Sequence, residues 1–374
     1  MDYQAPKFFL PRPQRFYSWW RTCQKEISID FYTIDEILEQ YGLKRINSPQ
    51  NASGGRRNAN IIVETSNGKI VLKRYRNSLG DSTIIQEHSI LKHLGKIGFP
   101  AVCLVSTPTG GTLIYYNDQR YAIYEFIDGF RFYDYILSSN LSRQYIAMAG
   151  ELLGQLHNDL KEFIPRGYNP DGFKSKTEGR WRSLDWFSNK LAFCIQNFST
   201  DHLNRKNSKI FALASHARKL EDQLARSIEI LDKADLPRQI IHKDYNKSNI
   251  LYRKNKSPVI IDFEIARLDW RLIDIIDGWE GFAKDKFIYN SKKMGIFFKA
   301  YQDKLKLPKD ELRFIPLVWE YLNLTRCILH LYSYVTTKDT YWIHEAYRFF
   351  KQTNCNLRHY GKLKKILGVS DLVR

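Results

Sequence analysis

The stretch from residue 240 to residue 266, IIHKDYNKSNILYRKNKSPVIIDFEIA, constrains the fold more strongly than any other part of the chain. It places charged and amide side chains between short apolar runs that are rich in isoleucine, leucine and valine. Such runs favour buried strands. Two of them, NILY and PVIIDF, flank a polar turn and would bring Asn249 and Asp262 side by side. We therefore expect a polar site that is held on a pair of strands.

The chemistry of this polar site follows from its oxygen atoms. Asn249 and Asp262 offer one amide oxygen and one carboxylate. Such ligands suit magnesium, which keeps several waters and binds nucleotide phosphates rather than a full protein cage. Asp244 then remains free to orient a hydroxyl and accept its proton during phosphoryl transfer. The stretch predicts a magnesium-dependent phosphoryl-transfer site.

A second hairpin is predicted in the N-terminal part of the chain. Runs rich in β-formers flank Asn67 and Gly68 in NIIVETSNGKIVLKRY, and Asn-Gly is a strong hairpin signal. On its second strand Val71, Lys73 and Tyr75 share one face, because side chains alternate along a strand. The preceding segment NASGGRRN contains glycines that allow backbone amides to approach a ligand closely. An ordinary glycine-containing turn is the alternative for that segment.

The segment DSTIIQEHSILKHLG predicts a helix with Asp81 or Ser82 as its N-cap and Gly95 near its end. Its apolar stripe consists of Ile84, Glu87, Leu91 and Leu94. A carboxylate thus falls on the stripe, and its burial is costly unless a cation or strong donors accompany it. Lys73 is the nearest candidate partner along the chain. The alternative is that Glu87 lies at the edge of the stripe and reaches water.

Two further helices carry recognisable ends. TIDEILEQYGL begins at Thr33, which with Glu36 forms a capping-box pattern, and ends at Gly42, a suitable C-terminal cap. A longer helix, SRQYIAMAGELLGQLHNDLKEF, is expected to begin at the N-cap candidate Ser142. We interpret His157 of this helix as a core or capping histidine rather than a ligand.

The composition indicates a globular chain with an anionic partner. Its 374 residues are 43% hydrophobic, so it can bury a substantial core and form one large bilobal domain or two to three lobes. The formal net charge of +18 favours nucleotide, nucleic acid, an acidic metabolite or a membrane surface. Basic residues are spread along the chain in short clusters, so a dedicated nucleic-acid arm is not evident and nucleic acid is not expected as the partner. A solvated basic surface is the alternative interpretation of most of these side chains.

Other patterns bear on the compartment. No run approaches the roughly 18 apolar residues that cross a bilayer, and MDYQAPKFF lacks the order of a secretory signal. We therefore expect a cytoplasmic protein without a membrane span. The five cysteines lie far apart without C-x-x-C spacing, so buried thiols are expected rather than a zinc site or disulfides. Residues 1–30 predict an extension that packs onto a neighbouring surface.

Several separated motifs occur in an order that is known from one family. The motifs are SGGRRNANIIVETSNGKIVLKRY, YEFIDG, LLGQLH, HKDYNKSNIL and IDFEIARLDWRLID. This series resembles the aminoglycoside phosphotransferase family, which includes choline-kinase-like, homoserine-kinase-like and spore-coat-kinase-like members. The resemblance covers roughly residues 33–340. It implies an α+β, bilobal, protein-kinase-like fold with a small β-rich N-lobe and a larger helical C-lobe.

The resemblance implies which residues bind ATP. They are Ser53, Gly54, Gly55, Lys73, Glu125 and Ile127. The first three would belong to the phosphate loop, and backbone groups around the last two would hold the adenine. Lys73 would contact the α- and β-phosphates, and Glu87 would be its partner on the helix.

The resemblance also implies the catalytic and metal-binding groups. Asp244 would be the catalytic base, and His242 would pack its loop. Asn249 and Asp262 would bind Mg²⁺, with Asp262 as the main ligand. Asp274 would be a structural acid that steadies the catalytic loop.

Some positions depart from the commonest family pattern. Lys243 replaces the glycine often found between the histidine and the aspartate, and Asn246 stands where histidine is common. Neither change removes a ligand, so both bear on substrate handling rather than on ATP chemistry. Glu264, shortly after Asp262, is a candidate ligand of a second metal. Pairing of Glu264 with a nearby arginine is the alternative.

The residues and the resemblance together predict transfer of the γ-phosphoryl group of ATP to a hydroxyl of a small molecule, such as an amino alcohol, a sugar or a related metabolite. We expect an extension at residues 1–30, an ATP-binding lobe at 31–126, and a helical lobe at 127–374 with the catalytic loop and the acceptor site. A protein or peptide kinase is one alternative, although no long activation segment lies between Asp262 and Asp274. A silent kinase-fold scaffold that binds anionic partners such as nucleic acid is the other.

Overall fold

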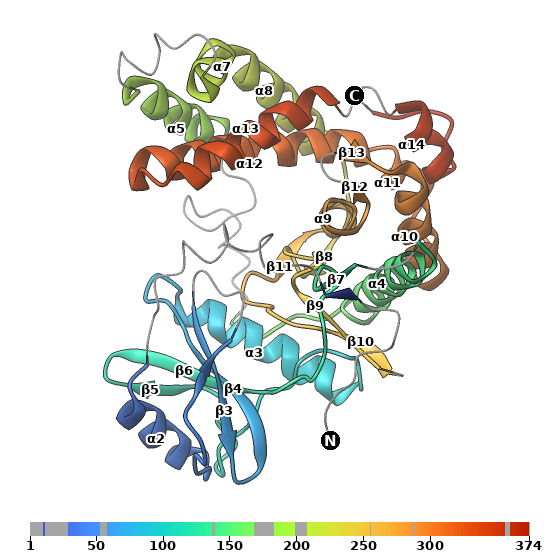
Figure 1. Ribbon diagram of the computed structural model, residues 1–374. Coiled ribbons are helices and arrows are strands. Elements are labelled where there is room, and N and C mark those ends of the chain that lie inside the picture. Colours follow the sequence, from blue (N-terminus) through green and yellow to red (C-terminus); the bar gives the residue numbers. More distant parts are fainter. Residues whose placement is uncertain are drawn as a thin grey trace. The chain divides into compact units, whose positions relative to one another are not determined.

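In a computed structural model of the protein, the hairpin predicted around Gly68 belongs to a five-stranded antiparallel sheet (Figure 1). Strands β3 (Ala59–Thr65) and β4 (Gly68–Arg74) pair along their full lengths. Gly68 has φ +106°, a conformation that side chains rarely adopt, so glycine suits this turn and the predicted hairpin is confirmed. The sheet order is β2-β3-β4-β6-β5, with β2 at Gln50–Asn51, β5 at Ile114–Tyr116 and β6 at Gln119–Glu125.

The chain divides into two compact units. The structure describes residues 10–11, 29–52, 58–136, 139–167, 183–198, 208–254, 256–285, 288–355 and 360–373. The first unit consists of Met1–Tyr168 and His242–Arg267, and the second of Asn169–Ile241 and Leu268–Arg374. The sequence placed boundaries after residues 30 and 126, between an extension, an ATP-binding lobe and an acceptor-binding lobe. This division by function stays a prediction.

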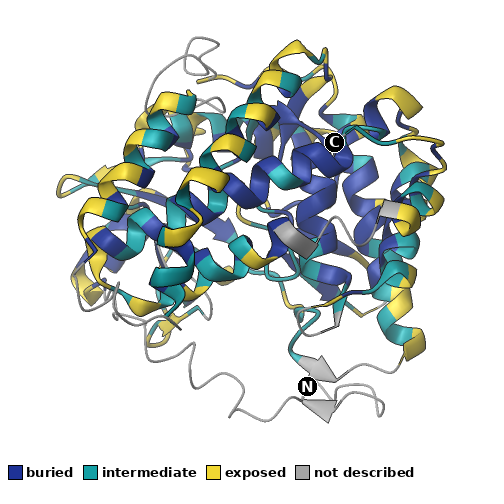
Figure 2. Cartoon of the chain, turned by 90° about the horizontal axis from the view of Figure 1, so that it is seen from above, coloured by how far each residue is buried: buried dark blue, intermediate teal, exposed yellow. Residues whose placement is uncertain are grey.

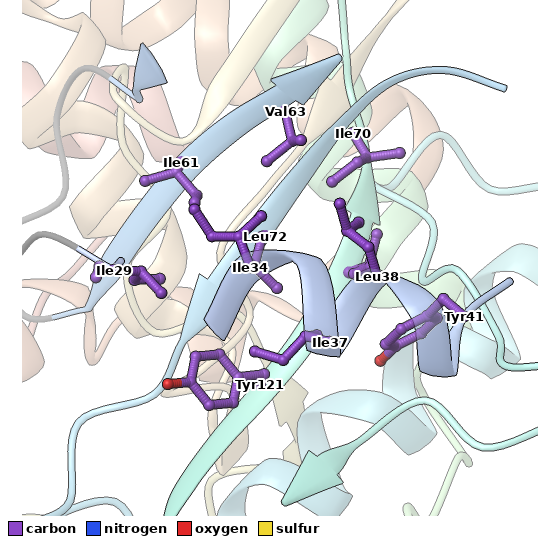
Figure 3. Packing of buried hydrophobic residues seen from close by; sticks show 12 residues of the cluster. Ile29, Ile34, Ile37, Leu38, Tyr41, Ile61, Val63, Ile70, Leu72 and Tyr121 are labelled. Atoms are coloured by element: carbon purple, nitrogen blue, oxygen red, sulfur yellow. The ribbon is translucent and has the colours of Figure 1, made fainter. Parts of the chain in front are cut away.

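One face of the sheet packs against helix α2 (Phe31–Gln40). Figure 3 shows Ile34, Ile37 and Leu38 of this helix against apolar side chains of the sheet. The sheet contributes Ile61, Val63, Ile70, Leu72, Tyr121 and Ile123, all of them buried. Because side chains alternate along strands, this apolar face leaves Lys73 and Tyr124 on the opposite face.

The two ends of α2 differ in how well the sequence predicted them. The N-cap is Asp30, whose carboxylate accepts hydrogen bonds from the Thr33 backbone N–H at 2.8 Å and the Thr33 hydroxyl at 2.7 Å. The prediction of Thr33 as N-cap was wrong because the helix begins earlier, at Phe31, so Glu36 lies beyond the capping-box position. Gly42 has φ +66° and follows the helix end as predicted.

Helix α3 (Asp81–Lys96) lies on the opposite face of the sheet, where Glu87 contacts Lys73 of β4. The predicted stripe is confirmed, since Ile84, Glu87, Leu91 and Leu94 are all buried. The predicted N-caps, Asp81 and Ser82, were wrong, because Gly80 occupies the cap position. The Asp81 carboxylate instead accepts a hydrogen bond from Arg120 of β6 at 2.7 Å.

The first unit also contains α4 (Ser139–Asp159) and the strand pair that was predicted around the polar site. Strands β9 (Ile250–Arg253) and β10 (Lys256–Ile260) are antiparallel, as expected. Helix α4 begins before the predicted N-cap Ser142, which therefore lies inside the helix. His157 is completely buried in α4, which confirms its place in the core.

Gly129 allows the segment after β6 to approach strand β9 closely. A Cβ atom at this position would lie 2.9 Å from the carbonyl oxygen of Tyr252. The next residue, Phe130, donates its backbone N–H to that same carbonyl at 2.9 Å. Residues 10–11 (β1) pair with Tyr135–Ile136 (β7) further along this segment.

The second unit is mainly helical. Its helices are α5 (Leu184–Gln196), α7 (Lys209–Ser215), α8 (Ala217–Lys233), α9 (Leu272–Phe282), α10 (Ser291–Lys304), α11 (Lys309–Leu312), α12 (Ile315–Thr337), α13 (Thr340–Cys355) and α14 (Tyr360–Leu367). Its strands are β8 (Arg238–Ile241), β11 (Arg267–Trp270), β12 (Lys284–Asp285) and β13 (Ile288–Tyr289), which pair as β8 with β11 and β12 with β13. Figure 2 shows helices with a dark-blue buried side and a yellow exposed side, as expected for amphipathic helices.

The sequence led us to expect no membrane-spanning helix and buried cysteine thiols. Among the described residues, no helix is long and apolar enough to cross a membrane. Of the free cysteines in the described ranges, Cys194 and Cys327 are buried as expected, whereas Cys103 is exposed. The expectation of buried thiols was therefore wrong for Cys103, which lies in the irregular segment between α3 and β5.

Candidate active site

A buried ion pair links β4 to α3. The Lys73 Nζ atom lies 3.3 Å from Glu87 Oε1, and the two side chains are only 6% and 1% exposed. The structure thus brings together the two residues that the sequence paired. The alternative in which Glu87 reaches water is excluded.

Three carboxylates surround the Lys73 amine. Asp262 Oδ1 lies 3.3 Å and Glu264 Oε2 lies 3.6 Å from Lys73 Nζ, in addition to Glu87. Burial disfavours the charged amine, but these carboxylates outweigh it and raise the pKa of Lys73 well above its ordinary value. Burial raises the pKa of Glu87, and Lys73 acts against that rise. Lys73 is therefore a permanent cation that suits contact with a phosphate.

The carboxylate of Asp244 is held by two amides in its own loop. Asp244 Oδ1 accepts a hydrogen bond from Asn246 Nδ2 at 2.7 Å, and Oδ2 accepts one from Asn249 Nδ2 at 2.8 Å. Burial raises the pKa of this carboxyl above its ordinary value, with the charge of Asp262 acting the same way. The carboxylate is thus held in one orientation and binds a proton more readily than an ordinary aspartate does.

His242 fixes the start of the same loop. Its Nδ1 atom accepts the backbone N–H of Asp244 at 3.2 Å, and its Nε2 atom lies 3.0 Å from the carbonyl oxygen of Ile261. The ring is completely buried and makes an edge contact with Phe263, with 4.7 Å between the ring centroids. His242 therefore ties the loop of Asp244 to the segment that follows β10, in agreement with its predicted packing role.

Asn249 and Asp262 lie at adjoining ends of the β9–β10 hairpin. The backbone N–H of Ile261 donates to the carbonyl of Asn249 at 2.9 Å, which holds the two segments together. Asn249 uses Nδ2 for both of its side-chain hydrogen bonds, so its Oδ1 accepts none from the described residues. Asp262 offers Oδ1 to Lys73 and keeps a side chain that is 44% exposed. One amide oxygen and one accessible carboxylate are the donor set that the sequence predicted for a metal.

Two residues of the site have left-handed backbone conformations. Lys243 has φ +71° and Asp262 has φ +67°. This region favours glycine, and among other residues it is tolerated best by asparagine and aspartate. A glycine at position 243 would adopt this conformation without the cost that a side chain brings.

Glu264 is engaged by three side chains. Its Oε1 accepts a hydrogen bond from Arg76 at 2.7 Å, and its Oε2 accepts one from Asn58 in addition to the approach of Lys73. Although burial raises it, the pKa of Glu264 is lowered overall, because Lys73 and Arg76 favour the charged form. The arginine pair that the sequence left open is therefore present.

The segment after β6 contains the residues expected to hold adenine. The backbone N–H of Glu125 donates to the Cys103 carbonyl at 2.9 Å, and its side chain accepts the Cys103 N–H at 2.8 Å. The backbone N–H of Ile127 has no partner among the described residues and is free to donate to a ligand.

Ser53, Gly54 and Gly55 lie outside the described residues. Asp274 is completely buried in α9, which belongs to the second unit. Their roles stay predictions.

Sequence reasoning missed several residues that contact the site. Tyr75 and Tyr124 donate hydrogen bonds to Glu87, and Arg76 and Asn58 hold Glu264. Alternation along the strand placed Tyr75 on the face of Lys73, which was the one available signal. The other contacts join distant parts of the chain and leave no local pattern.

A buried lysine–glutamate pair between a sheet and a helix, beside a loop that carries a buried aspartate, is typical of a phosphotransferase. The chain belongs to the phosphotransferase enzyme family, which it matches over residues 49–288. The resemblance to the aminoglycoside phosphotransferase family is therefore confirmed, as is the α+β, protein-kinase-like fold.

Individual relatives agree with this assignment. A homoserine kinase from Chelativorans sp. (strain BNC1) is 22% identical over 307 residues, which cover 81% of this chain and 85% of that kinase. The solved structure of a microcompartment-associated aminopropanol kinase is 16% identical and has a TM-score of 0.61, covering 89% of this chain and 98% of the other. An aminoglycoside phosphotransferase from Alicyclobacillus acidocaldarius subsp. acidocaldarius DSM 446 is 16% identical with a TM-score of 0.64, covering 92% and 98%.

The protein is thus a small-molecule O-kinase, which transfers a phosphoryl group to a hydroxyl. Membership of a kinase family implies the use of ATP and a divalent metal. This function stands ahead of the two alternatives, a protein kinase and a silent scaffold.

Proposed function

We propose that the protein transfers the γ-phosphoryl group of Mg·ATP to the hydroxyl of a small amino alcohol or hydroxy amino acid. The observation that carries the proposal is the assembly of a fixed cation, a held carboxylate and two oxygen groups suited to a metal within one unit. These are Lys73, Asp244, Asn249 and Asp262.

The proposed chemistry relies on positioning and charge. Asp244 accepts the proton of the acceptor hydroxyl as its oxygen attacks the γ-phosphorus. Because each carboxylate oxygen of Asp244 accepts only one hydrogen bond from the loop, a lone pair remains for the hydroxyl. Lys73 contributes its charge to the α- and β-phosphates, where it stabilises the charge that moves onto the leaving group. No covalent intermediate is required.

The metal fits the donor set of the β9–β10 hairpin. Asn249 Oδ1 and the Asp262 carboxylate are the two proposed ligands, and Mg²⁺ favours such partial sets because it keeps waters and phosphate oxygens as its other ligands. When bound, the ion would neutralise phosphate charge and orient the γ-phosphoryl group. Glu264 is assigned to the ion pair with Arg76 rather than to a second metal, since Arg76, Asn58 and Lys73 already contact its two oxygens.

The nucleotide contacts are proposed from the same unit. Ser53, Gly54 and Gly55 are assigned to the phosphate loop, which leads into β3. Backbone groups of Glu125 and Ile127 are assigned to the adenine, supported by the unpaired N–H of Ile127 among the described residues.

The acceptor class is inferred from the relatives and from charge. The named acceptors homoserine and aminopropanol each combine a hydroxyl with an amine. The net charge of +18 disfavours a polycationic acceptor, which would be repelled at long range. A neutral or zwitterionic amino alcohol or hydroxy amino acid meets both constraints.

The test is a transfer assay with γ-labelled ATP and Mg²⁺. The acceptors are homoserine, ethanolamine, 1-amino-2-propanol, choline, glucose and one aminoglycoside, and the products are identified by mass. Asp244→Asn is the inactive control, and Asp118→Asn in the exposed β5–β6 turn is the matched charge-removal control. We expect one amino alcohol or hydroxy amino acid to give a phosphorylated product with wild type and with Asp118→Asn but not with Asp244→Asn.

Two results would contradict the proposal. Transfer to glucose alone would overturn the acceptor class but keep the O-kinase. A product that forms equally well with Asp244→Asn would remove Asp244 from the reaction and overturn the proposed mechanism.

A further inference from the structure

Two tyrosine hydroxyls hold the carboxylate of Glu87. Tyr75 donates to Glu87 Oε2 at 3.0 Å, and Tyr124 donates to Glu87 Oε1 at 3.1 Å. The two hydroxyl oxygens are also 2.5 Å apart. Each carboxylate oxygen of Glu87 therefore lies within hydrogen-bond distance of a tyrosine hydroxyl. The two hydroxyls have one proton each for these three contacts, so the tyrosine pair acts as one unit that compensates a carboxylate only 1% exposed.

The same two tyrosines also contact the cation of the pair. The Lys73 amine lies 4.9 Å from the ring centroid of Tyr75 and 5.6 Å from that of Tyr124. Each tyrosine thus touches the lysine with its ring and the glutamate with its hydroxyl. Such ring faces attract a desolvated cation, so the tyrosines fix both ends of the ion pair.

The Lys73 amine has competing partners. Asp262, the proposed metal ligand, is as near to it as Glu87, and Glu264 is only slightly further away. If Glu87 could rotate away, the amine would lose its partner on α3 and turn toward Asp262. The position of Glu87 therefore decides whether Lys73 stays on the α3 side of the site.

We infer that Tyr75 and Tyr124 are positioning residues for the phosphotransfer site, which lock the Glu87 carboxylate and through it set the place of the Lys73 amine. They do not touch the reacting atoms in this role. The inference rests on the proposed contact of Lys73 with the ATP phosphates.

A second layer of polar groups fixes Tyr75. His88 Nε2 lies 3.0 Å from the Tyr75 hydroxyl, and His88 Nδ1 lies 2.9 Å from the hydroxyl of Thr112. Tyr75, His88 and Thr112 are all buried. The Tyr75 hydroxyl therefore has a third polar contact besides Glu87 and Tyr124, which restricts its freedom to leave the carboxylate.

The contacts of the two tyrosines with Glu87 have a kinetic consequence that a general packing role would not have. Lys73 is assigned to the ATP phosphates and not to the acceptor. Loss of either hydroxyl should therefore weaken the binding of ATP and leave the binding of the acceptor unchanged. One hydrogen bond to a charged group corresponds to about a tenfold effect.

The experiment measures KM for ATP, KM for the acceptor and kcat for Tyr75→Phe and Tyr124→Phe. Each variant is expected to raise KM for ATP about tenfold and to leave KM for the acceptor within about twofold. Tyr252→Phe is the matched control, because Tyr252 is also buried in this unit and donates its hydroxyl to the carbonyl of Tyr145 at 2.9 Å. It is expected to keep the wild-type KM for ATP.

A double-mutant cycle tests whether the tyrosines act through Glu87. In a Glu87→Gln background, Tyr75→Phe and Tyr124→Phe are expected to change ATP affinity by less than about twofold, because the group they position is already altered. Full additivity of the effects would overturn the inference. Melting temperatures without nucleotide identify any variant that fails to fold, and each tyrosine variant alone is sufficient for the test.

Failure of the inference is distinguishable from failure of the proposed function. Binding of Mg·ATP to the wild type is measured first, as stabilisation against heat. No stabilisation of the wild type would contradict the proposed function itself. Stabilisation that is equal in wild type and both tyrosine variants would leave the kinase intact and overturn the inference.

Discussion

The side-chain amide of Asn249 donates hydrogen bonds to the backbone carbonyl of Asp244 at 2.9 Å and to its carboxylate at 2.8 Å. The proposed metal ligand therefore also orients the proposed base. Because one side chain contacts the proposed base and offers an oxygen to the proposed metal, a single loop fixes the spacing of these two groups. This relationship gives a reason for the many polar side chains in the loop, because they hold one another in place.

Replacement of Asp244 by asparagine should reduce kcat by about 10²- to 10⁴-fold, the range typical of a general base. The substitution keeps the shape of the side chain but removes the proton acceptor. Stabilisation of the fold by Mg·ATP should change little, because Asp244 is not assigned to the nucleotide. The measurement is steady-state kinetics beside a thermal shift, with Asp118→Asn as control. Wild-type turnover in Asp244→Asn would show that another group is the base.

Asp262→Asn should abolish the dependence of ATP binding on Mg²⁺ while the chain stays folded. Asparagine tolerates the left-handed backbone that Asp262 adopts at φ +67°, so the change removes charge rather than conformation. Asp118→Asn is a closely matched control, since Asp118 has φ +56° and lies in an exposed turn. A titration of ATP-induced stabilisation with Mg²⁺ provides the readout. An unchanged Mg²⁺ midpoint in Asp262→Asn would rule this residue out as the main ligand.

Glu264→Gln should leave the Mg²⁺ midpoint unchanged and lower the free energy of unfolding by about 1–3 kcal/mol. The reason is that Arg76 and Lys73 lose part of their charge partner, whereas the metal keeps its ligands. Arg76→Gln breaks the same pair from the other side and should destabilise to a similar extent. Denaturant unfolding and the Mg²⁺ titration measure the two effects. A raised Mg²⁺ midpoint would instead assign Glu264 to a metal.

Local patterns in the sequence predicted much of the site. The hairpin at Gly68, the buried position of Glu87 and the β9–β10 strand pair follow from alternation and helical spacing, which depend on neighbouring residues only. The pairing of Lys73 with Glu87 followed because a buried carboxylate requires a partner. These features are predictable because each is specified by a short segment.

The features that sequence reasoning missed depend on contacts between distant segments. Arg76 and Glu264 are 188 residues apart, and Tyr124 and Glu87 are 37 residues apart, so no short pattern contains either pair. The misplaced start of α3 has the same origin. Asp81 was expected to cap α3, but its carboxylate is taken by Arg120 from another strand.

Stability should fall below neutral pH because of His88. Burial lowers the pKa of His88 from 6.5 to about 3. Between these values the unfolded chain binds a proton that the folded chain does not, so the free energy of unfolding decreases as pH falls below 6.5. Relative to His88→Gln, wild type should lose about 2 kcal/mol more between about pH 7 and about pH 5. The measurement is denaturant unfolding of both proteins at both pH values. An equal loss of free energy of unfolding in wild type and His88→Gln would contradict the prediction.

At position 243 the free energy of unfolding should be higher with glycine than with alanine. Its φ of +71° costs a residue with a side chain about 1–2 kcal/mol, whereas glycine adopts it without that cost. Glycine also adds freedom to the unfolded chain, which offsets roughly 0.4–1 kcal/mol of the gain. Lys243→Ala removes the same side chain but keeps the backbone cost, so it is the control that isolates conformation from lost contacts. We expect Lys243→Gly to exceed Lys243→Ala in free energy of unfolding by about 1 kcal/mol, which is the reverse of the order found in helices. Denaturant unfolding of both variants decides the point, and an alanine variant more stable than the glycine variant would show that the left-handed conformation carries no cost at this position.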